Sequence, residues 1–78
     1  MSKADEMFEK LGYRKRQKGQ YIEYIKTENS VKEEYVISFM MKTVMATLYA
    51  GYFKKPLALE IKEIQAINEK IKELGWNE

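Results

Sequence analysis

The stretch YVISFMMKTVMATLYAGYF, residues 35–53, decides the fold of this chain, because its nineteen residues carry only one charge, Lys42. About twenty apolar residues can span a bilayer, but the central lysine and the several hydroxyl-bearing side chains argue against a membrane helix. The many β-branched and aromatic residues favour two strands that meet at residues 40–43. We therefore predict a β-hairpin. A helix over residues 43–53 is the competing interpretation, because the spacing of apolar residues in a short run does not distinguish a helix from a strand.

Pairing Phe39 with Val44 sorts the side chains of this hairpin into two faces. One face is apolar and has the composition of a core: Tyr35, Ile37, Phe39, Val44, Ala46 and Leu48. The other face is mixed: Val36, Ser38, Met40, Met45, Thr47 and Tyr49. We expect the first face to be covered by the rest of the chain.

A short helix is predicted before the strands. Ser2 is a suitable N-cap, and apolar residues follow it at helical spacing. Gly12 supplies the left-handed residue that ends a helix, which lets Tyr13 fold back on Phe8.

A longer helix is predicted after the strands, with charged residues on its remaining faces. Gly75 ends it as Gly12 ends the first helix, and this places Trp76 against Ile71. Its apolar residues recur at spacings of three and four: Ile61, Ile64, Ile67, Ile71 and Leu74.

Two further segments complete the sheet. Residues 14–18, RKRQK, lead through a turn at Lys18 and Gly19 into the strand QYIEYIKT, and the polar residues 28–34 form a loop before the hairpin. Pro56 stops the last strand. The predicted order is α-β-β-β-β-α, an α+β fold with an antiparallel meander and both terminal helices on the face of Ile37 and Phe39.

The composition limits the chemistry of the chain. Its 78 residues predict a single domain over 1–78, and the absence of cysteine and histidine removes thiol chemistry and the commonest general base and metal ligand. The start MSKADEMFEK lacks the pattern of a signal peptide, so we expect a cytoplasmic protein. We expect no membrane association, and a net charge of +2 leaves only local patches for electrostatic partners.

No catalytic constellation is found. Glu33 with Glu34, and Glu60 with Glu63, are the carboxylate pairs nearest to a metal or acid–base site, but a solvated loop and a helix start explain them more simply. We therefore expect no enzyme, no cofactor and no metal site.

A basic cluster is the candidate nucleic-acid contact. It consists of Arg14, Lys15, Arg16 and Lys18, with tyrosines nearby that can stack on bases. Lysines and arginines also protect an edge strand from pairing with other chains. The small net charge favours the protected edge, and nucleic-acid binding is kept as the alternative function.

The uncovered face of the hairpin is the candidate protein interface. Tyrosine is common at interfaces, and exposed methionine makes an adaptable contact surface. We predict that this surface pairs with a second copy of the chain in a homodimer or, alternatively, docks a different protein. Its predicted residues are Val36, Met40, Met41, Met45, Tyr49 and Phe53.

The phrases ADEMFEKLGY at the front and EIQAINEKIKELGW at the back resemble a group of small uncharacterised proteins encoded by phages and prophages of Gram-positive bacteria. The resemblance covers both ends well and the middle loosely, and Met40-Met41 departs from the polar turn expected there. It implies a phage setting and carries over no activity. The function expected is a small non-enzymatic protein-binding module, one form of which is a host-defence inhibitor of the anti-CRISPR kind.

Overall fold

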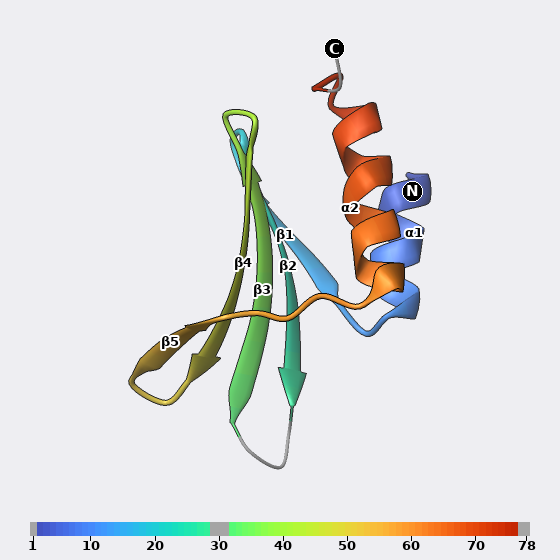
Figure 1. Cartoon of the computed structure of the whole chain (residues 1–78). Coiled ribbons are helices and arrows are strands. Elements are labelled where there is room, and N and C mark those ends of the chain that lie inside the picture. Colours follow the sequence, from blue (N-terminus) through green and yellow to red (C-terminus); the bar gives the residue numbers. More distant parts are fainter. Residues whose placement is uncertain (1, 29–31, 77–78) are drawn as a thin grey trace.

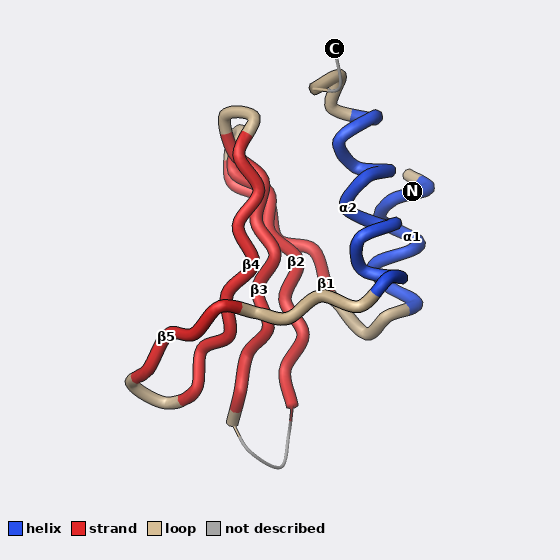
Figure 2. The backbone as a smooth tube through the Cα atoms, viewed as in Figure 1, coloured by secondary structure: helices blue, strands red, loops and turns tan. Residues whose placement is uncertain are grey.

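The computed structural model describes residues 2–28 and 32–76. Five strands form one antiparallel sheet in the order β1-β2-β3-β4-β5, and the two helices lie side by side against one of its faces (Figures 1 and 2). This confirms the predicted α+β class, the meander and the terminal helices. The elements are α1 (Lys3–Lys10), β1 (Arg14–Lys18), β2 (Tyr21–Glu28), β3 (Glu33–Met40), β4 (Thr43–Ala50), β5 (Phe53–Pro56) and α2 (Ile61–Glu73).

Helix α1 begins and ends as predicted. The Asp5 backbone N–H donates to Ser2 Oγ at 3.0 Å, which satisfies one of the free donors of the first turn. Gly12 has a φ of +94°, and the Tyr13 N–H then donates to the Phe8 carbonyl at 3.0 Å. The rings of Phe8 and Tyr13 meet edge to face with their centroids 5.8 Å apart.

Helix α2 ends in the same way. Gly75 has a φ of +73°, and the Trp76 N–H donates to the Ile71 carbonyl at 3.1 Å. Trp76 is half-buried and packs at the margin of the core, with its ring centroid 6.4 Å from that of Phe39.

Replacing Gly75 by alanine is expected to lower the free energy of unfolding by about 1 kcal/mol, the usual cost of placing a side chain in the left-handed region. A Cβ at this position meets no other atom within 4 Å, so the loss has a purely backbone origin. Urea denaturation followed by circular dichroism measures it. An unchanged unfolding midpoint would contradict the assigned helix end.

The hairpin β3–β4 has the predicted register. Phe39 pairs with Val44 and Ile37 with Ala46, so the two predicted faces are confirmed. Met41 and Lys42 form the two-residue turn and both have positive φ, 51° and 62°. This turn geometry matches the twist of the strands, although glycine or asparagine usually adopts it.

The end of the last strand was predicted wrongly. The sequence predicts one strand up to residue 53, but β4 ends at Ala50, the chain turns at Gly51, and residues 53–56 return as β5 along β4. Gly51 has a φ of +63°, which a hairpin turn of this kind requires. Pro56 can close β5 because the outer edge of this strand is unpaired and its missing N–H costs no ladder bond.

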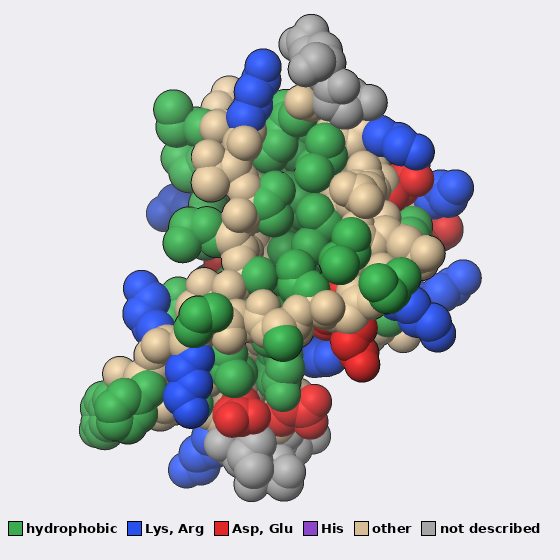
Figure 3. All heavy atoms as spheres, viewed as in Figure 1, with side chains coloured by type: hydrophobic (Ala, Val, Ile, Leu, Met, Phe, Trp, Pro, Cys, Tyr) green, Lys and Arg blue, Asp and Glu red, His purple; other side chains and the backbone are tan. Residues whose placement is uncertain are grey.

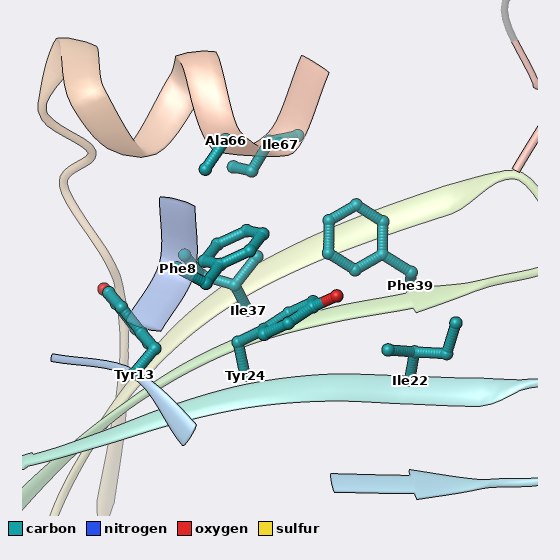
Figure 4. Close-up of a cluster of buried hydrophobic side chains, with 8 residues drawn as sticks. All are labelled: Phe8, Tyr13, Ile22, Tyr24, Ile37, Phe39, Ala66 and Ile67. Carbon is teal, nitrogen blue, oxygen red and sulfur yellow. The ribbon is translucent and has the colours of Figure 1, made fainter. Parts of the chain in front are cut away.

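The core lies between the helices and the centre of the sheet (Figure 4). Phe8 is fully buried and stacks on the ring of Tyr24, with centroids 3.8 Å apart, and Phe39 meets both rings edge to face. Helix α2 closes the cluster from above through Ala66 and Ile67. The remaining members are Tyr13, Ile22 and Ile37.

A buried polar network joins the two helices to the sheet. Asp5 Oδ1 accepts hydrogen bonds from the Tyr24 hydroxyl at 2.6 Å and from the Lys70 ammonium at 3.4 Å, while Asp5 Oδ2 accepts one from Lys15 at 3.0 Å. Lys70 is itself buried and also contacts Glu73 at 3.4 Å. Burial alone would raise the pKa of Asp5, but the hydrogen bonds from Tyr24 and Lys15 and the charge of Lys70 lower it to about 2.

A second polar contact lies at the other end of the helix pair. The Tyr13 hydroxyl donates to Glu63 Oε2 at 2.5 Å, and Glu63 Oε1 accepts from the backbone N–H of Glu60 at 2.8 Å. Burial, together with the hydrogen bond to Glu63, raises the pKa of Tyr13. The ammonium of Lys26 lies 3.9 Å from Glu63 and 5.0 Å from the centre of the Tyr13 ring, so the buried carboxylate has a cation beside it.

Candidate interaction surface

The face of the sheet that points away from the helices is called here the open face. Residues that are direct partners across strands lie on the same side. One row runs Arg14, Ile25, Val36 and Thr47, and the next runs Arg16, Glu23, Ser38 and Met45. Both helices lie on the opposite side (Figure 1). The open face also carries Lys18, Tyr21, Glu34, Met40, Tyr49 and Lys54.

Four of the predicted interface residues share the open face. Met40 and Met45 are exposed, Met45 by 58%, and Tyr49 is exposed by 37%. Val36 belongs to the same face but is buried at its centre. The structure thus brings two exposed methionines, an exposed tyrosine and a buried valine onto one face of the sheet.

The other two predicted interface residues lie elsewhere. Met41 is exposed in the β3–β4 turn, at the end of the face. Phe53 was assigned to the wrong side, because it pairs with Ala50 and thus stands on the helix-bearing side of the sheet, where it is 70% exposed. The error follows from the unforeseen turn at Gly51, which reverses the chain and resets the alternation of side chains.

A hollow of about 360 Å³ lies near the middle of the open face. Ile25 and Val36 are the buried aliphatic residues of its lining. The other lining residues are the tyrosines Tyr21 and Tyr49 and the charged residues Arg14, Arg16, Glu23 and Glu34.

Glu23 is the buried charge of this face. Its carboxylate forms an ion pair with the guanidinium of Arg16, and its Oε2 accepts a hydrogen bond from the Tyr21 hydroxyl at 2.8 Å. That hydrogen bond, together with burial, raises the pKa of Tyr21. Arg16 therefore neutralises Glu23, and both Arg16 and Tyr21 are held at the margin of the hollow.

The basic cluster of β1 is divided between the two sides of the sheet. Lys15 points to the helix-bearing side, where it contacts Asp5, and Arg16 is paired with Glu23. Arg14 and Lys18 lie on the open face, and neither forms an ion pair within residues 2–28 and 32–76. The strand β1 is an edge of the sheet and all its residues are exposed, as the protected-edge interpretation requires.

The carboxylate pairs do not form a shared site. Glu60 and Glu63 hold the start of α2, and Glu33 and Glu34 point to opposite faces of β3. Over the part of the chain that the structure describes, no group of three residues of the metal-ligating types is placed to hold an ion. In the same part, no helix is long and apolar enough to cross a membrane.

An apolar strip on the helix-bearing side was not predicted. The helices cover the centre of the sheet, so Val44, Ala46 and Leu48 of β4 are only half-buried, although this face was expected to be covered. Ile71 of α2 is also only partly buried where it packs against the core, and hydrophobic side chains form a band between the sheet and the helix (Figure 3). The period of each element was visible in the sequence, but the lateral position of the helices was not.

Comparison of the chain with protein-family models, with curated proteins and with solved structures found no match.

Proposed function

We propose that this chain is a non-enzymatic protein-binding module that docks a host or phage protein through its open face. The observation that carries the proposal is the exposure of Met40, Met45 and Tyr49 on one uncovered sheet face. The same face has a hollow that Tyr49 lines together with the buried Ile25 and Val36. Aromatic and methionine side chains of this kind are enriched at protein interfaces, and a pocket lets an interface bury an anchor side chain.

Nucleic-acid binding is the alternative, and the charges support it less well. Two of its four predicted contacts, Lys15 and Arg16, already have carboxylate partners. A phosphate ligand would also meet the carboxylates of Glu23 and Glu34 on the same face. A nucleic acid would then contact Arg14, Lys18 and the tyrosine rings, and a test of this alternative addresses those groups.

The proposed setting is a phage or prophage, and inhibition of a host defence system is one specific form of the function. Both rest on the resemblance of residues 4–13 and 63–76 to the phage-encoded group. The residues of that resemblance form the helices and their ends, away from the open face, so they bear on ancestry and leave the partner unspecified.

Affinity capture tests the proposed surface. The tagged protein and its Tyr49→Lys variant are incubated with lysates of phage-infected host cells, and the enriched proteins are compared. We expect a partner that the parent enriches and that Tyr49→Lys loses at least about tenfold, because a lysine in the interface loses the buried ring and adds a desolvated charge.

Tyr52→Lys is the matched control, since Tyr52 is fully exposed in the β4–β5 turn and lies outside the open face. Both variants should keep the circular dichroism spectrum of the parent. The open face is not the docking surface if both variants lose the partner equally. The same conclusion follows if Tyr49→Lys still captures the partner fully.

A further inference from the structure

We infer that the hollow of the open face accepts one apolar side chain from an extended, acidic segment of the partner protein. This inference rests on the proposed function and specifies the chemistry of the docked segment. It combines the shape of the hollow with the charges around it.

The hollow is suited to a single anchor side chain. Its volume of about 360 Å³ is at the low end of the roughly 300–1,000 Å³ of small-molecule pockets. Ile25 and Val36, both buried, give it aliphatic surface, and Tyr21 and Tyr49 line it with partly exposed rings. A leucine or phenylalanine side chain can pack on this aliphatic and aromatic part of the lining. The charged part of the lining, which includes Arg14 and Glu34, then requires polar groups of the partner beside that anchor.

The charge of the face favours a carboxylate beside that anchor. The open face holds the cations Arg14, Arg16, Lys18 and Lys54 and, among the described residues, only two carboxylates, Glu23 and Glu34. Arg16 is neutralised by Glu23, which leaves the β1 side with an excess of positive charge.

The positions of these charges also give the docked segment an orientation. Arg14 is the direct neighbour of Ile25 in its row. On the far side of the hollow, Glu34 and Lys54 both lie beside Tyr49, so their charges offset each other. An acidic residue of the partner should therefore lie over β1, and the other side of the anchor should be neutral.

A second copy of the chain is a poorer occupant. Face-to-face packing of two identical open faces would bring together two surfaces that each carry an excess of cations, and like charges across an interface are unfavourable. A single-stranded nucleic acid would meet the cations but would leave the aliphatic centre without an apolar partner.

Titration by ¹H–¹⁵N NMR with synthetic peptides tests the inference. The probe is acetyl-Gly-Glu-Glu-Leu-Gly-amide. Two matched peptides replace its leucine by alanine or its glutamates by lysines. We expect the probe to shift the amide signals of Ile25, Val36 and Tyr49 and to bind at least about tenfold more tightly than either matched peptide, because it alone buries an apolar anchor beside a carboxylate.

Two charge-reversed variants complete the design. Arg14→Glu should weaken binding of the probe at least about fivefold. Lys62→Glu, an equal change of charge on the exposed surface of α2, should leave it unchanged. Weakening of similar size in both variants would show that only the net charge matters, and the inference would be wrong.

Other results would also overturn it. One is that the probe causes no shift of the amide signals at millimolar concentration, and another is that the peptide with lysines binds as tightly as the probe. A third is that a thymidine or uridine oligonucleotide shifts the same amides and binds more tightly than the probe. A fourth is that the protein forms a concentration-dependent dimer through the open face. If the partner captured from lysates is lost in Tyr49→Lys but fully kept in Arg14→Glu, the proposed function stands and the inference of an acidic residue beside the apolar anchor is wrong.

Discussion

Replacing Phe8 by alanine is expected to lower the melting temperature of the protein by about 12–40 °C. Phe8 is fully buried and stacks on Tyr24, with Phe39 and Tyr13 at its edges. Truncating a core phenylalanine usually costs about 3–5 kcal/mol, and 1 kcal/mol corresponds to about 4–8 °C for a domain of this size. The whole stability expected for such a chain is about 4–12 kcal/mol, so the loss is a large part of it.

Thermal unfolding followed by circular dichroism measures this loss. Phe53→Ala is the control, because it removes the same side chain from a position that is 70% exposed, and its effect should stay within about 0.5 kcal/mol. A Phe8→Ala variant within 1 kcal/mol of the parent would mean that the core is not centred on the contact between α1 and β2.

The parts of the fold that follow from local chemistry were predicted. Gly12 and Gly75 ended both helices because only their backbone geometry fits the helix stop, and the residues that follow them fold back as expected. The pairing of Phe39 with Val44 followed from a buried face with a period of two, which a shift by one residue would turn outward.

Features that depend on distant parts of the chain were not predicted. The turn at Gly51 was hidden because the residues on both sides of it suit a strand equally well, so the sequence favoured one long strand over two short ones. The helical pattern predicts Lys70 and Glu63 as surface residues, but both are buried, because they contact Asp5 and Tyr13 from the other end of the sequence.

The candidate site was only partly predicted, because it also depends on contacts between distant parts of the chain. The alternation of side chains along β3 and β4 predicts Met40, Met45 and Tyr49 on one face. The hollow, however, is lined partly by residues of β1 and β2, and the sequence does not show how these strands align with β3 and β4. The ion pair between Arg16 and Glu23 had no signal in the sequence beyond the opposite charges of two neighbouring strands.

The second large effect concerns Asp5, whose replacement by asparagine is expected to lower the free energy of unfolding at pH 7 by about 2–3 kcal/mol. The change keeps the shape of the side chain but removes the negative charge that faces the buried Lys70 and that strengthens the hydrogen bond donated by the Tyr24 hydroxyl. A buried cation that loses a partner is costly, and hydrogen bonds to charged groups are worth about 1.5–3 kcal/mol. Glu6→Gln, an exposed position in the same first turn, is the control and should change stability by only a few tenths of a kcal/mol.

The same variant has a defined dependence on pH. The pKa of Asp5 is about 2 in the folded state against an ordinary 3.8, so in acid the unfolded chain binds more protons at this group. The stabilisation is therefore complete above about pH 5 and is lost as the pH falls through the folded-state value near 2, a loss of about 2 kcal/mol. Asp5→Asn cannot be protonated there, so its unfolding midpoint in urea should approach that of the parent between pH 5 and pH 2. A difference between the two proteins that persists unchanged at pH 2 would show that the charge of Asp5 is not what stabilises the network.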